Sequence, residues 1–140
     1  MNFHSFAKVA WLVILIISQF LSGCSQAPGR QGLTDQRATE IAENVLQAIN
    51  DGNYSNFSRD FSSNMKKEIP QSDFANLREL ILKASGLYNS ILETVSVDDE
   101  RPGYIVYIFT CQFENGQFQL NLTFKEGIDQ IEGLFISSVT

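Results

Sequence analysis

The spacing of apolar residues changes once along this sequence, near Leu87, and that change limits the folds open to the chain. Before Leu87, apolar residues recur every three or four positions, which is the period of a helix with one buried face. After it, apolar and polar residues alternate, which is the period of a strand with one buried face. Helices that precede an antiparallel sheet indicate an α+β domain.

Three amphipathic helices are predicted before the change, over about 34–50, 54–69 and 72–84. Thr34 or Asp35 can cap the first helix and Ser72 the third, because their side-chain oxygens accept from the free N–H groups of a first turn. The stripe expected to be buried on the first helix is Ala38, Ile41, Ala42, Val45, Leu46 and Ile49. The corresponding residues on the second are Tyr54, Phe57, Phe61 and Met65.

Four strands are predicted after the change, over about 88–97, 105–113, 117–125 and 130–139. The middle two are expected to form a hairpin, because Asn115-Gly116 is a typical two-residue turn. That turn would place Phe113 opposite Phe118 and bring all inner side chains of both strands to one face. The predicted architecture is three helices packed on a four-stranded antiparallel sheet.

The first 23 residues have the layout of a secretory signal peptide. An uninterrupted apolar run over 9–17 follows Lys8, and no acidic residue occurs before Cys24. Lys8, Ser18 and Gln19 bracket a run shorter than the roughly 20 apolar residues that a bilayer-spanning helix needs. We therefore expect a leader that is removed.

The residues Leu21-Ser22-Gly23-Cys24 resemble the lipobox of bacterial lipoproteins. The resemblance implies cleavage between Gly23 and Cys24 and attachment of lipid, palmitate included, to the Cys24 thiol. Acyl chains contribute about 0.8 kcal/mol per buried methylene, so two or more hold a protein on a membrane. The expected location is the cell envelope, on the outer membrane if the organism has two. The alternative is an ordinary signal peptide with a chance cysteine.

Cleavage there would leave a lipidated N-terminus and linker over 24–33 and one domain over 34–140. This mature chain keeps 9 of the 10 basic residues and all 16 acidic ones, a net charge of −7. A negative chain repels phosphate backbones, so nucleic acid is not an expected partner.

The same cleavage would remove the only histidine, His4, which is the usual proton-transfer residue near neutral pH. Cys111 then has no disulfide partner and is expected to be a buried, inert thiol. The mature chain has no cluster with metal-ligand spacing, so neither a metal nor another cofactor is expected.

The order of the predicted elements resembles the cone-shaped fold of nuclear transport factor 2 and its relatives. More closely, the segment 52–57, Phe61, Met65-Lys66 and the final stretch 130–136 resemble the family called domain of unknown function 3887. The resemblance implies a sheet that curves around helices and leaves a hollow between them. The family brings no catalytic residues to carry over.

Aromatic side chains would line that hollow: Tyr54, Phe57, Phe61, Tyr107, Phe109 and Phe124. They either fill the hollow as a core or line an open pocket for a small apolar ligand. Glu93 alternates with Ile91, Val95 and Val97. If that face points inward, the carboxyl lies opposite Tyr107 or Phe109 and its pKa is raised by burial. Alternatively Glu93 lies at the rim, or a bulge turns it outward.

Three functions remain open from the sequence. The first is a lipid-anchored, non-catalytic accessory module that binds an envelope protein. The second is a module that binds a small apolar ligand inside the cone. The third is an isomerase- or dehydratase-like enzyme that uses Glu93 with Tyr107 as acid and base.

Overall fold

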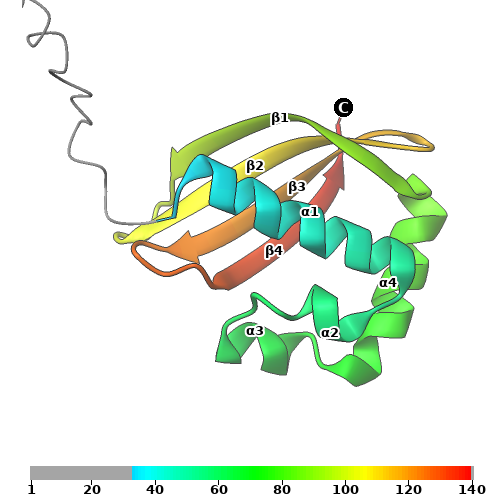
Figure 1. Ribbon diagram of the computed structural model, residues 1–140, viewed down its shortest axis with the longest axis horizontal. Helices are drawn as coiled ribbons and strands as arrows, with labels where there is room; N and C mark the ends of the chain where they lie inside the picture. The colour runs from blue at the N-terminus through cyan, green and yellow to red at the C-terminus, as the bar shows by residue number, and fades with distance from the viewer. Residues whose placement is uncertain (1–32, 140) are drawn as a thin grey trace, which may run out of the picture. The chain divides into compact units, whose positions relative to one another are not determined.

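The computed structural model describes residues 33–139, which form an α+β domain with four helices and one four-stranded sheet (Figure 1). The helices are α1 (Asp35–Asp51), α2 (Tyr54–Phe57), α3 (Ser63–Glu68) and α4 (Gln71–Ser85). The strands are β1 (Tyr88–Asp98), β2 (Tyr104–Phe113), β3 (Gly116–Lys125) and β4 (Ile131–Ser138). The predicted fold class and the four antiparallel strands are confirmed.

Residues 31–140 make up one compact unit. None of the helices in residues 33–139 has the length and apolar character needed to cross a membrane. The predicted leader, its cleavage site at Gly23 and Cys24, and nearly all of the linker lie outside the described residues.

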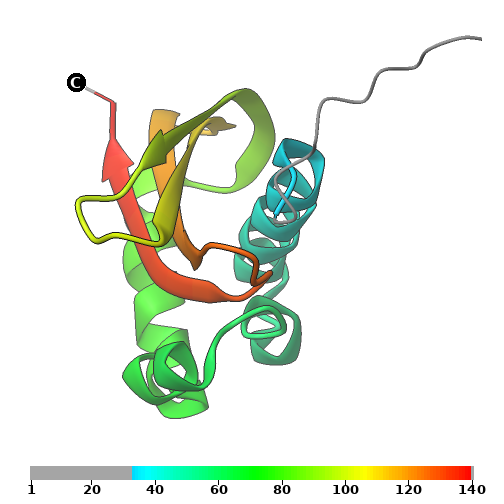
Figure 2. The same cartoon turned by 90° about the vertical axis from the view of Figure 1, so that its left-hand side faces the viewer.

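The strands follow one another as an antiparallel meander in the order β1-β2-β3-β4. The sheet curves strongly, and α1 packs against its concave side (Figure 2). Burial alternates along β2, where Tyr107, Phe109, Cys111 and Phe113 are buried and the residues between them are half-buried. The core therefore lies between this side of the sheet and the helices.

The first helix forms as predicted: both of its ends and its buried stripe are those that the sequence indicates. The Thr34 hydroxyl accepts a hydrogen bond from the Arg37 N–H at 3.2 Å, and Gly52 ends α1 with a left-handed φ of 68°. Every residue of the predicted stripe is 2% exposed or less. The cap, the stop and the buried stripe of α1 all lie within one short segment, so contacts with distant segments do not change them.

The predicted second helix is wrong: two short helices, α2 and α3, replace it. Ser62 caps α3 by accepting from the Met65 N–H. The chain before it runs beside β4, where Ile131 N–H donates to the Asp60 carbonyl at 2.8 Å and Ser62 N–H donates to the Ile131 carbonyl at 3.0 Å. This pairing with a distant strand draws Phe61 out of the helix, although its spacing is helical.

The cap predicted at Ser72 is also wrong. Helix α4 starts at Gln71 with Pro70 as its N-cap, and the Ser72 hydroxyl bonds to the Asp73 carboxylate instead, at 2.9 Å. Proline fits this position because a first turn leaves its N–H groups without helical partners.

The β2–β3 hairpin has a register two residues away from the predicted one. Glu114 and Asn115 form the turn, so Phe113 lies opposite Gly116 and Phe118 lies opposite Cys111. The turn contacts the link between α4 and β1, since Glu114 N–H donates to the Leu87 carbonyl at 3.0 Å. A shift of two residues leaves each side chain on its predicted face, so the prediction of the inner face still holds.

Candidate functional site

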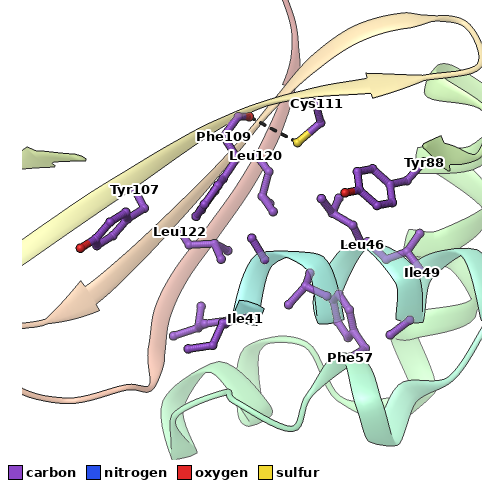
Figure 3. Close-up of a cluster of buried hydrophobic side chains, with 14 of the residues drawn as sticks. Ile41, Leu46, Ile49, Phe57, Tyr88, Tyr107, Phe109, Cys111, Leu120 and Leu122 are labelled. Carbon is purple, nitrogen blue, oxygen red and sulfur yellow. Dashed lines mark hydrogen bonds between the residues drawn. The ribbon is translucent and has the colours of Figure 1, made fainter. Parts of the chain in front are cut away.

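The six aromatic residues expected to line a hollow belong to the hydrophobic core or pack against it. Figure 3 shows three of them, Phe57, Tyr107 and Phe109, near α1. Five of them, Phe57, Phe61, Tyr107, Phe109 and Phe124, are 2% exposed or less. Tyr54 is half-buried, and its hydroxyl donates to the Ile69 carbonyl at 2.9 Å.

Ring contacts hold this cluster together. Phe57 lies 4.9 Å from Phe61 and 4.7 Å from Phe74 between ring centroids. On the sheet, Tyr107 lies 5.9 Å from Phe124 in an edge-to-face contact. These separations are typical of close aromatic packing in a core. The side chains therefore occupy the space in which a ligand would have to lie.

Glu93 lies outside this cluster. Two register irregularities interrupt β1, one of them between Ile91 and Glu93, so Glu93 pairs with Thr110 and is exposed to solvent. An irregularity of this kind adds a residue to one strand and turns the following side chains over. The inward orientation of Glu93 is wrong, and the bulge considered as its alternative is what the structure has.

The Tyr107 hydroxyl makes its hydrogen bonds at the start of α1 instead. Its hydroxyl lies 3.1 Å from Asp35 Oδ1 and 3.3 Å from the Leu33 carbonyl oxygen. Tyr107 faces the core and Glu93 faces solvent, so the structure does not bring this proposed acid–base pair together.

Two buried groups near α1 have shifted pKa values. Burial, with a smaller contribution from the Glu43 carboxylate, raises the pKa of the Cys111 thiol to about 12. Burial and the same carboxylate also raise the pKa of Tyr88 above its ordinary value. The Tyr88 hydroxyl is buried without a hydrogen bond of good geometry among the described residues. Both groups stay protonated near neutral pH, so neither is a nucleophile there.

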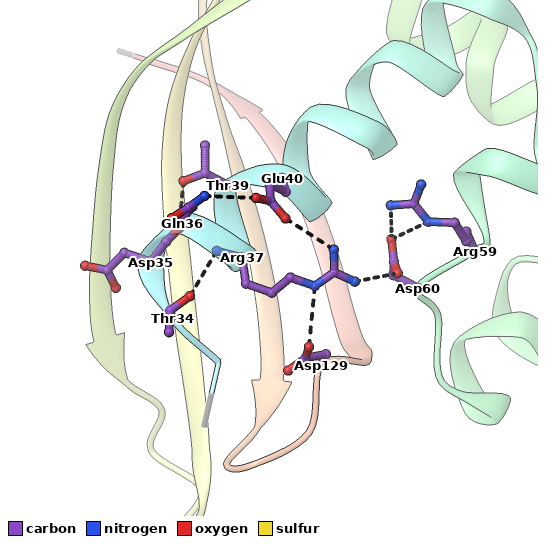
Figure 4. A network of polar contacts seen from close by, with 9 residues as sticks. All are labelled: Thr34, Asp35, Gln36, Arg37, Thr39, Glu40, Arg59, Asp60 and Asp129. Carbon is purple, nitrogen blue, oxygen red and sulfur yellow. Dashed lines mark hydrogen bonds and ion pairs between the residues drawn. The ribbon is translucent and has the colours of Figure 1, made fainter. Parts of the chain in front are cut away.

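A charged network ties three segments together at the start of α1 (Figure 4). Arg37 makes ion pairs with Glu40 at 3.5 Å and with Asp60 and Asp129 at 3.4 Å each. Asp60, with only 10% of its side chain exposed, also pairs with Arg59 at 2.8 Å. Each carboxylate has a cationic partner, which marks the network as a structural connection between α1, the α2–α3 segment and the β3–β4 turn.

No group of three or more His, Cys, Asp or Glu side chains within residues 33–139 could hold a metal ion. In the acidic stretch Asp98-Asp99-Glu100, Asp99 is paired with Arg101, whose guanidinium lies 3.1 Å from its carboxylate.

The outer face of the sheet carries apolar side chains that the sequence analysis did not place there. Cross-strand pairing aligns Val95, Ile108, Asn121 and Phe135 in one row across all four strands. Val95 is 44% exposed and Phe135 is 62% exposed. The irregularity before Glu93 moves Val95 to this face, and nothing in the local sequence signals it.

A groove of about 460 Å³ lies between α4, the start of β3 and the end of β4. It is lined by Leu80, Ile81, Ala84 and Ser85 of α4 and by Phe118, Ile136, Ser137 and Ser138 of the strands. Most of these side chains are apolar, and Leu80 is 67% exposed. The groove is thus an apolar surface rather than a reactive centre.

A family model described as a protein of unknown function, DUF3887, matches residues 42–134. The chain belongs to the DUF3887 family. The match to DUF3887 runs from within α1 into β4 and so includes most of the core, the register irregularities of β1 and most of the groove. It confirms the resemblance to this family that the sequence indicates. No curated protein matches the chain.

Proposed function

We propose that this DUF3887 protein is a lipid-anchored protein of the cell envelope whose domain binds another protein and performs no catalysis. The observation that carries the proposal is the contrast between the two faces of the sheet. The inner face is filled by aromatic side chains, whereas the outer face and the α4 groove expose Val95, Phe135 and Leu80. Exposed apolar patches on a small soluble domain are typical of protein-binding surfaces.

The anchor is supported by the sequence Leu21-Ser22-Gly23-Cys24. Eight residues, 25–32, separate Cys24 from the first described residue, and even fully extended they reach about 26 Å at 3.3 Å per residue. A lipid on Cys24 would therefore keep the domain, and its partner, within a few nanometres of the bilayer.

The domain itself is proposed to be a short relative of the nuclear transport factor 2 cone. The curved antiparallel sheet wrapped around α1 supports this assignment. In this small version the cone is filled.

Mass spectrometry of the intact protein from membranes tests the anchor. The expected product starts at Cys24 and carries the mass of the lipid, and Cys24→Ser should yield a chain without that mass. A wild-type product with a bare Cys24 thiol, or with the leader attached, would refute the anchor.

Site-specific crosslinking in native membranes tests the binding function. A photoreactive residue at Phe135 or Leu80 should give a defined product with one protein, and the same residue at Lys67 on α3 is the control. Equal products from all three positions, or none from Phe135 and Leu80, would contradict the proposal.

The alternative function, a small apolar ligand inside the cone, has weaker support because Phe57, Phe109 and Phe124 are fully buried. Native mass spectrometry of the delipidated protein should show no bound small molecule. The isomerase-like alternative predicts a loss of activity in Glu93→Gln, but Glu93 is exposed on the opposite face from Tyr107.

A further inference from the structure

The two edges of the sheet differ in how they are protected. Strand β1 carries two register irregularities and the charged residue Glu93, and such features discourage a further strand from pairing. Strand β4 is the other edge, and residues 133–139 contain no charge and no proline. By sequence and position, β4 is the edge that can accept another strand.

The backbone groups at this edge can be assigned from the ladder. Val139 N–H donates to the Gln117 carbonyl of β3 at 3.1 Å. Because backbone groups alternate in direction along a strand, those of Leu134, Ile136 and Ser138 point away from β3. Among the described residues, no other element makes a hydrogen bond to them.

One backbone bridge already lies beside β4. The parallel bridge between Phe61 and Ile131 occupies the position next to the start of β4, with hydrogen bonds of 2.8 Å and 3.0 Å to either side. The chain then turns away into α3, and the remaining edge of β4 has no strand beside it. An extended polypeptide that continued from this bridge would meet the unpaired groups of Leu134, Ile136 and Ser138.

The apolar groove adjoins this same part of β4. Ile136 and Ser138 line it from the strand side, and Leu80, Ile81 and Ala84 line it from α4. In a strand added to β4, every second side chain would point toward this groove. Backbone pairing and an apolar groove for alternate side chains are the two parts of recognition by strand addition.

We infer that the free edge of β4 and the adjoining groove bind an extended, apolar segment of another protein as a fifth strand. This inference specifies the partner surface of the proposed function. Continuity with the Phe61–Ile131 bridge favours a polypeptide strand over a small molecule. The absence of charge over 133–139 favours an apolar sequence with alternating small side chains.

The unit of residues 31–140 contains its own core and is suitable for the test without any lipid. The probe is the capped peptide Lys-Thr-Val-Thr-Val-Thr-Lys, titrated into isotope-labelled protein and followed by NMR and amide exchange. The expected result is saturable binding, with amide exchange of Ile136 and Ser138 slowed at least tenfold. The same peptide with its central threonine replaced by proline should not bind.

Two variants keep the test specific. Ser138→Pro removes an N–H that faces the free edge and should abolish binding. An edge strand tolerates proline at such a position, so the domain should still fold. Leu80→Lys alters the groove at an exposed position and should weaken binding at least tenfold. The matched controls are Ser138→Ala, which keeps the N–H, and Leu92→Lys, which changes a 52% exposed leucine on β1. Both controls should bind as the unchanged domain does.

Three outcomes would overturn the inference. One is no binding up to the solubility limit of the peptide. Another is binding that Ser138→Pro and Leu80→Lys leave unchanged. The third is protection of the Ile136 and Ser138 amides that grows with protein concentration alone, since a second copy would then occupy the edge. The test contains no lipid, so its failure is distinct from failure of the Cys24 anchor, and crosslinking at Phe135 would still test partner binding at the outer face.

Discussion

Replacing Gly86 by alanine is expected to destabilise the domain by about 2–5 kcal/mol, the sum of two separate effects. Gly86 links α4 to β1 with φ 71° and ψ −164°. This backbone region is essentially restricted to glycine, and another residue there costs about 1–3 kcal/mol. A Cβ at this position would also lie 2.7 Å from the Cβ and 2.8 Å from Oε2 of Glu114, so Glu114 must move.

Moving Glu114 has its own cost. Its Oε2 accepts a hydrogen bond from the Leu87 N–H at 2.8 Å, and this contact helps to hold the β2–β3 turn against the α4–β1 link. Loss of such a hydrogen bond costs about 1–2 kcal/mol. The Gly86→Ala penalty should therefore be smaller in a Glu114→Ala background, which has no carboxylate to displace but keeps the backbone strain and the close contact with the Cβ of residue 114.

Urea unfolding of residues 31–140, followed by far-ultraviolet circular dichroism, measures these costs. With a slope of about 1–2 kcal/mol per molar urea, Gly86→Ala should lower the unfolding midpoint by at least about 1 M. Gly116→Ala is the control, because Gly116 also has a positive φ of 132° but no atom lies within 4 Å of its added Cβ. The reasoning is refuted if Gly86→Ala costs less than about 1 kcal/mol, or costs the same in both Glu114 backgrounds.

Three further predictions concern the core and its connections. Arg78→Ala should cost about 2 kcal/mol in urea unfolding, since the guanidinium donates to the last carbonyls of α1 at 2.6 Å and 2.8 Å; a loss below about 0.5 kcal/mol would contradict this. Phe57→Ala should cost about 3–5 kcal/mol, whereas Phe135→Ala, at a side chain 62% exposed, should change the midpoint little. Stability should fall as pH rises from about 9 toward 12, because the folded state holds the proton on Cys111 that the unfolded chain releases. Cys111→Ala should make that decline less steep, while the raised pKa of Tyr88 sustains the remainder above about pH 10. An equally steep decline in this variant would count against the shifted thiol as a cause.

Features that depend only on residues close together in the chain could be predicted from the sequence. Helix α1 has its cap at Thr34, its stop at Gly52 and its buried stripe within one segment. The inner face of β2 and β3 follows from strict alternation, and it remained correct although the register differed by two residues. In both cases the burial pattern was specified by local periodicity.

Features set by distant contacts could not be predicted in this way. The helix expected over 54–69 is divided because Ser62 pairs with Ile131, and the hairpin turn moves because Glu114 binds Leu87. Glu93 faces solvent because β1 has an extra residue before it. For the candidate site, the sequence identified the aromatic side chains, but only packing shows that they fill the space between the sheet and the helices.

Helix α1 comes first in the described chain, yet most of the other buried core residues belong to the sheet that follows. A chain emerging N-terminus first therefore cannot cover the apolar stripe of α1 until the strands have also emerged. Because such long-range contacts form late, the core cannot be completed before the strands are available. That order would suit the proposed leader and anchor, which would require the chain to cross a membrane before it folds.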